Sequence, residues 1–221
     1  QCQLCLRACT ASIGFVLPHT MYWGILTLMP LALIAMAWKQ GVVPAVPYET
    51  DAGPFERLLD WISDRTGLFV ALWSVMAVFA YTYEVTARYL FNMPTIWVHE
   101  SSFLLFGMQY MMAGAYGLLH GSHVRVDVLY TKLSLRKQAA LSVFTSVFFF
   151  IFVLAMMATA NRFFFDSLAQ DERSVETWQV HYWPVKMMML VGACLIFLAG
   201  ISRLIKDIRI YEKQLRSEVA A

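Results

Sequence analysis

The sequence predicts an all-α integral membrane protein: a bundle of four transmembrane helices, preceded by an interfacial amphipathic helix and an extra N-terminal hydrophobic segment. The chain is 59% hydrophobic and 14% charged, whereas soluble domains carry about 25% charged residues. A bilayer core of about 30 Å needs about 20 helical residues, and open strands cannot satisfy their backbone groups in lipid. Four stretches of that length contain few or no charges: 68–87, 97–119, 139–160 and 183–202.

Residues 1–53 form an N-terminal extension that contains a further apolar segment, shorter than the four spans. Residues 23–38 are apolar, begin and end with tryptophan, and contain Pro30. As a helix they reach about 24 Å, which is short for a crossing. A short fifth crossing, a hairpin and a surface-lying segment all stay open, and a helix embedded in the membrane is favoured. The proline-rich residues 41–54 that follow are typical of a linker.

Residues 54–65 have the pattern of an amphipathic helix. Glu56, Arg57, Asp60 and Asp64 occupy one side, which predicts a horizontal amphipathic helix lying in the membrane surface. A soluble linker helix is the alternative. The apolar side consists of Phe55, Leu58, Leu59, Trp61 and Ile62.

The loop charges predict the topology of the four-span core. Lys and Arg gather between the second and third spans and after the fourth, and such residues favour the cytoplasmic side. Both ends of the core, which covers 54–211, are therefore expected in the cytoplasm, followed by a cytoplasmic tail over 212–221. The loop at 162–182 is then outside, and its acidic residues are Asp166, Asp171, Glu172 and Glu176.

Ionisable residues lie near the ends of the spans. Glu84 and Arg88 are four residues apart, which suits a helical ion pair. Glu100, at the start of the second span, is at a similar depth and within reach of Arg88. These three residues predict a structural ion-pair network between the first two spans.

Small residues recur along the second span, and Gly192 and Gly200 do so on the fourth. Such faces let another helix approach closely. They are consistent either with docking of a partner membrane protein or with packing inside this bundle, and spacing does not separate the two. The residues on the second span are Gly107, Ala113, Gly114, Gly117 and Gly121.

No residue pattern predicts catalysis, a cofactor or a metal. Cys2, Cys5 and Cys9 form a short run without a fourth ligand nearby, and Cys194 suits packing within a span. Phosphate loops, H-E-x-x-H and serine elbows are absent from the sequence, and scattered basic residues do not suit nucleic acid. A small channel and a haem-binding anchor of an oxidoreductase stay as alternatives, the latter because of four histidines near helix ends: His99, His120, His123 and His181.

Residues 88–130 carry a family resemblance. They read RYLFNMPTIWVHESSFLLFGMQYMMAGAYGLLHGSHVRVDVLY. The Arg-Tyr-x-Phe-Asn motif at 88–92, the Trp97 and Glu100 pair, and the segment from Gly121 to Asp127 resemble the small membrane subunit, called DctQ, of tripartite ATP-independent periplasmic (TRAP) transporters. The similarity extends over 54–211 and does not explain residues 1–53.

The resemblance implies a non-catalytic scaffold subunit in a bacterial inner membrane. Its expected partners are lipids, a large elevator-type membrane subunit and a periplasmic binding protein that docks near the 162–182 loop. The expected process is sodium-driven uptake of organic acids. Longer members of the family, associated with C4-dicarboxylates, have a similar length.

Overall fold

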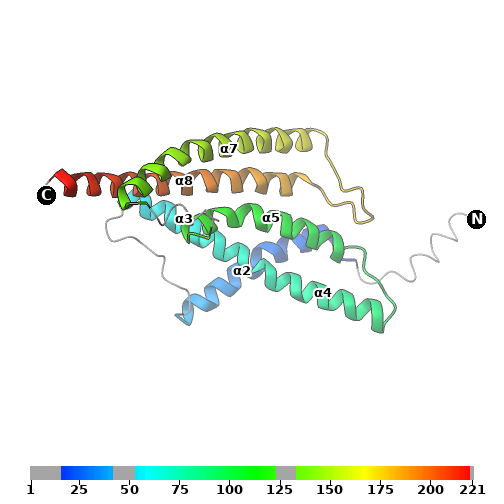
Figure 1. The fold of residues 1–221 in the computed structure, drawn as a ribbon. Helices are drawn as coiled ribbons and strands as arrows, with labels where there is room; N and C mark the ends of the chain where they lie inside the picture. Colours follow the sequence, from blue (N-terminus) through cyan, green and yellow to red (C-terminus); the bar gives the residue numbers. More distant parts are fainter. Residues whose placement is uncertain (1–15, 42–52, 123–132, 220–221) are drawn as a thin grey trace, which may run out of the picture. The chain divides into compact units, whose positions relative to one another are not determined.

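The structure is a computed structural model that describes residues 16–41, 53–122 and 133–219. Within these residues the chain is helical apart from turns and one isolated bridge between Arg173 and His181. The predicted all-α class is therefore confirmed. The helices are α2 (His19–Lys39), α3 (Pro54–Ala71), α4 (Trp73–Leu90), α5 (Val98–Leu119), α7 (Leu135–Ala169) and α8 (Trp183–Val219) (Figure 1).

Five helices in the described part of the chain are long and apolar enough to cross a membrane. Four of them contain the expected spans. The fifth is α2, which begins four residues before the expected segment 23–38 and continues through Pro30. α3 and α4 meet at Leu72, which is itself in an α-helical conformation. The two helices therefore form one helical stretch, Pro54–Leu90, that is long and apolar enough to cross a membrane, and the first expected span lies within it.

The last two spans are parts of longer helices than predicted. α7 continues nine residues beyond 160, and α8 continues well beyond 202. Hydropathy marks where a helix leaves the lipid, but the residues that follow contain neither glycine nor proline, so nothing local ends the helix there.

The chain divides into two compact units. The first comprises Gln1–Pro44, Leu68–Tyr110 and Phe165–Lys186, and the second comprises Ala45–Gly67, Met111–Phe164 and Met187–Ala221. Each unit has its own buried residues.

In the first unit, α2 and α4 are joined by a hydrogen bond to a backbone carbonyl of α2 that lacks its usual donor within the helix. Pro30 has no N–H, so it cannot bond the carbonyl of Leu26 one turn earlier. The indole N–H of Trp73 bonds this carbonyl instead, at 2.9 Å. All three residues are buried. Pro30 therefore leaves the Leu26 carbonyl free to accept the hydrogen bond that joins α4 to α2.

We expect Trp73→Phe to lower the free energy of unfolding by about 2 kcal/mol, because it leaves a buried carbonyl without a donor. Pro30→Ala supplies the missing N–H, so the loss should be much smaller when both substitutions are present. Thermal or denaturant unfolding of the four variants in detergent measures this coupling. Strictly additive effects of the two substitutions would contradict it.

In the second unit, α7 and α8 run side by side (Figure 1), and small residues set their close approach. Gly200 lies against the ring of Phe149, with no room for a Cβ. Phe150 and Phe197 pack edge to face, with ring centroids 5.5 Å apart. Elsewhere on α8, a Cβ at Gly192 would lie 2.7 Å from the Met111 carbonyl oxygen of α5.

Candidate functional site

The most extensive polar site is a set of buried charges between α3, α5 and α8. Asp60 on α3 is 2% exposed. Its carboxylate accepts hydrogen bonds from Ser202 Oγ and Lys206 Nζ, both at 2.8 Å. One turn earlier, Glu56 is paired with Arg209. The pairing repeats along both helices because 56 and 60 on α3, and 206 and 209 on α8, are each separated by about one helical turn.

A third carboxylate extends this site to the end of α5. Asp64 Oδ1 lies 3.2 Å from His120 Nε2, and the His120 ring packs on Tyr116 with centroids 4.1 Å apart. α5 ends here because Gly121 adopts φ +67°, and the Ser122 N–H bonds the Gly117 carbonyl in a glycine-type cap. We call the following residues the α3–α8 charge cluster: Glu56, Asp60, Asp64, His120, Ser202, Lys206 and Arg209.

The charge cluster shows what the polar side of α3 contacts. Its carboxylates are buried against α8 and α5, where basic partners stand at matching positions. On the opposite side, Phe55, Leu58 and Trp61 are exposed, Ile62 is partly exposed, and Leu59 is buried. α3 is thus amphipathic, with its polar face inward and most of its apolar face outward.

The predicted ion-pair network in the first unit is formed only in part. Arg88 Nε donates to Glu84 Oε1 at 2.8 Å, and the other Glu84 oxygen accepts from the backbone and hydroxyl of Thr95. Glu84 therefore ties the end of α4 to the turn before α5. Glu100 is not brought to Arg88: it is buried, and neither of its carboxylate oxygens has a hydrogen-bond partner among the residues that the structure describes. Depth alone predicted contact, but it does not fix the direction in which a side chain points from its helix.

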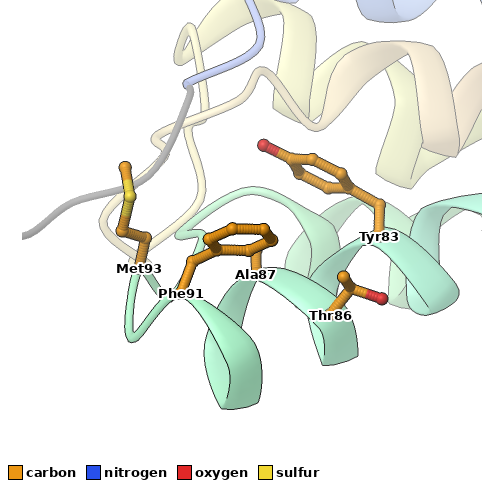
Figure 2. A pocket seen from close by; sticks show the side chains of 5 residues that line it. All are labelled: Tyr83, Thr86, Ala87, Phe91 and Met93. Carbon is orange, nitrogen blue, oxygen red and sulfur yellow. The ribbon is translucent and has the colours of Figure 1, made fainter.

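A small hollow lies beside this turn. Its volume is about 200 Å³. Figure 2 shows its lining side chains at the end of α4 and in the following turn: Tyr83, Thr86, Ala87, Phe91 and Met93. The lining is mainly apolar, so the hollow suits an aliphatic or aromatic group rather than a charged solute.

The predicted small-residue face of α5 divides into packed and open positions. Gly114 lies against Ile196 of α8, 2.6 Å from where its Cβ would be. Within the described residues, Gly107, Gly117 and Gly121 have no neighbouring atom within 4 Å of such a Cβ, and Ala113 is partly exposed. Packing within the bundle therefore uses Gly114, whereas the other glycines leave room for another helix. The spacing pattern missed Gly67, against which Tyr116 packs closely.

The four acidic residues of the expected outer loop have different surroundings. Asp166 lies within α7, because this helix continues to Ala169. Asp171 Oδ2 is 3.2 Å from Arg173 Nη2, and Asp171 Oδ1 is 3.0 Å from His181 Nδ1. Glu172 is paired with Lys186, and Glu176 is exposed. Part of the expected negative charge is therefore balanced inside the loop.

The hydrogen bond from Lys186 lowers the pKa of Glu172 below its usual value. A lowered pKa in the folded state stabilises the fold at pH values above the unfolded pKa of about 4.3, and this stabilisation disappears as the pH falls through the folded-state value. We therefore expect the wild type to have a higher melting temperature than Glu172→Gln at pH 7, and this gap in melting temperature to close below pH ~4. Since the pair is partly exposed, its contribution should stay below about 1 kcal/mol. An unchanged gap across this pH range would contradict the assignment.

Histidine and cysteine positions do not converge in the described residues. His120 and His181 each lie beside a carboxylate, and His99 is exposed. Cys194 lies 3.7 Å from the Met157 sulfur. No group of three or more potential metal ligands occurs within 16–41, 53–122 and 133–219. The remaining residues of these predictions lie outside the described part of the chain: Cys2, Cys5, Cys9 and His123.

Comparison with protein families gives one match. The family model described as "Tripartite ATP-independent periplasmic transporters, DctQ component" matches residues 77–210, more than half of the chain. The matched region includes most of α4, all of α5 and α7, and most of α8, and leaves out α2 and α3. A comparison with curated proteins finds no match. The family match does not support the haem-anchor alternative.

Proposed function

Because the chain belongs to the DctQ component family of tripartite ATP-independent periplasmic transporters, we propose that it is the non-catalytic small subunit that scaffolds the large membrane subunit. Family membership and the apolar helices identify it as a multi-pass subunit of the inner membrane. The proposed role is to brace the static part of the large subunit while the transporting part moves.

The outward-facing residues support a scaffold. In the first unit, α5 exposes Phe103 and Tyr110 on either side of Gly107, which leaves a notch where a helix of the large subunit could approach. Nearby, the Gln109 amide donates to Ser74 Oγ at 2.7 Å, although Gln109 Oε1 has no hydrogen-bond partner in the part of the chain that the structure describes. A polar group in a span favours contact with protein over lipid.

The ionisable side chains also support this role. Glu84 in the first unit and Asp60 in the second each accept hydrogen bonds from groups of this same chain at both carboxylate oxygens. These hydrogen bonds stabilise each unit internally, as expected for a rigid support.

Within the transporter, we propose sodium-driven uptake of organic acids delivered by a periplasmic binding protein, with C4-dicarboxylates as the first class to test. The sodium and substrate sites would belong to the large subunit. The binding protein would dock beside the loop 170–182, with the exposed Glu176 and Asp166 contributing salt-sensitive contacts.

Reconstitution tests the proposal. This chain should co-purify with the large subunit of its transporter. Proteoliposomes should take up radiolabelled organic acid along a sodium gradient only when the large subunit and the binding protein are also present. Uptake by this chain alone, or full uptake by the large subunit without it, would contradict a scaffold role.

A further inference from the structure

His19, the first residue of α2, and Leu17 just before this helix both contact Trp178 of the loop 170–182. The Trp178 indole N–H donates to the Leu17 carbonyl at 3.0 Å, and His19 Nε2 donates to the Trp178 carbonyl at 2.9 Å. The His19 and Trp178 rings meet edge to face at 5.1 Å. Trp178 is buried, although it lies in a loop. The contacts therefore use both the side chain and the backbone of this residue.

Further contacts follow along α2 in order. The Tyr22 hydroxyl donates to the Ser101 carbonyl of α5 at 3.0 Å, and the Leu26 carbonyl accepts the bond from Trp73 of α4. Beyond Leu26, α2 continues to Lys39. The whole helix is about 32 Å long at 1.5 Å per residue, which matches a bilayer core of about 30 Å.

We propose that α2 is a fifth membrane span whose first residues clamp the 170–182 loop. The start of α2 and this loop then lie on one side of the membrane, and the end of α2 lies on the other. The exposed Trp38 and Lys39 suit that second interface. The docking role of the loop rests on the proposed function, whereas the crossing and the clamp do not.

The contacts with the start of α2 explain how the loop keeps an unfavourable backbone conformation. Asp171 and Gln179 have positive φ angles of 46° and 54°, which cost free energy for residues other than glycine unless their surroundings hold them. In the same loop, the Ser174 N–H bonds the Val180 carbonyl at 2.9 Å, and Val175 is 96% exposed. The loop therefore presents a fixed apolar tip, which suits an apolar patch on the docked binding protein.

Cysteine labelling tests the crossing. In a variant with all four native cysteines replaced by serine, single cysteines are placed at Thr20, Gln40 and Val175, all of which are exposed. A membrane-impermeant maleimide should label Thr20→Cys and Val175→Cys in vesicles of one orientation and Gln40→Cys only in the opposite orientation. Labelling of Thr20→Cys and Gln40→Cys from the same side would overturn the fifth span.

Hydrogen–deuterium exchange tests the clamp on the full chain in detergent. His19→Ala should speed exchange of the Ser174 and Tyr182 amides about fivefold, which corresponds to the loss of one net hydrogen bond. The matched control is Thr20→Ala on the same turn, which should leave these amides unchanged. Equal exchange in wild type and His19→Ala would overturn the clamp. Neither test uses transport, so these results stand apart from success or failure of the proposed function.

Discussion

Asp60→Ala is expected to lower the free energy of unfolding by about 3–5 kcal/mol, because it leaves a buried lysine without its counter-charge. Lys206 is mostly buried, and its ammonium group lies 2.8 Å from the Asp60 carboxylate. The same substitution removes the acceptor of the Ser202 hydroxyl. Thermal unfolding in detergent, followed by circular dichroism, measures the loss.

Three variants separate burial from charge in this prediction. Asp60→Asn keeps an acceptor for Ser202 but removes the charge, so it should lie between wild type and Asp60→Ala. Asp60→Leu combined with Lys206→Met removes both charges and should recover much of the stability. Arg173→Ala breaks an exposed pair and should cost less than about 1 kcal/mol. A loss after Asp60→Ala as small as that after Arg173→Ala would show that Asp60 is not shielded.

The helices could be predicted from the sequence because each depends on a local property. Length and lack of charge predicted the spans, and α5 begins and ends within one residue of the expected 97–119. Spacing predicted that α3 is amphipathic. It did not predict which way α3 faces, because a row of carboxylates fits water and fits a row of cations equally well. The deciding residue, Lys206, lies 146 positions beyond Asp60.

The same limit applies to α2. Taken alone, Pro30 suggests an interrupted helix, and a 16-residue apolar segment suggests a marginal crossing. The donor that compensates for Pro30 is Trp73, 47 positions away from the Leu26 carbonyl that it bonds. A local pattern cannot show that the carbonyl freed by a proline has found such a donor. The available sequence signal is a tryptophan near the start of another span.

Glycine spacing shows a third limit. Gly117 and Gly192 both belong to small-residue patterns in spans, yet their surroundings differ. A Cβ at Gly192 would meet the backbone of Met111, whereas a Cβ at Gly117 would meet no atom within 4 Å. A repeat of small residues indicates that a helix can approach, and only the three-dimensional arrangement shows whether that helix belongs to the same chain.

This difference gives a matched pair of substitutions. Gly192→Leu should destabilise the protein by at least about 3 kcal/mol, because the obstructing atom is a backbone carbonyl oxygen that cannot rotate away. Gly117→Leu should change the melting temperature little, since its side chain enters open space. If the open face of α5 receives the large subunit, Gly117→Leu should nevertheless reduce co-purification with that subunit.

Melting of the isolated chain and yield of the complex are therefore measured for both variants, with Gly117→Ala as the conservative control. A folded Gly117→Leu protein with reduced complex yield separates assembly from folding, because no atom of the described part of the chain lies within 4 Å of the new Cβ. Normal complex yield would show that Gly117 faces lipid and would move the interface to another part of the surface. A stable Gly192→Leu protein would contradict the close packing of α8 on α5, on which the rigidity of the second unit depends.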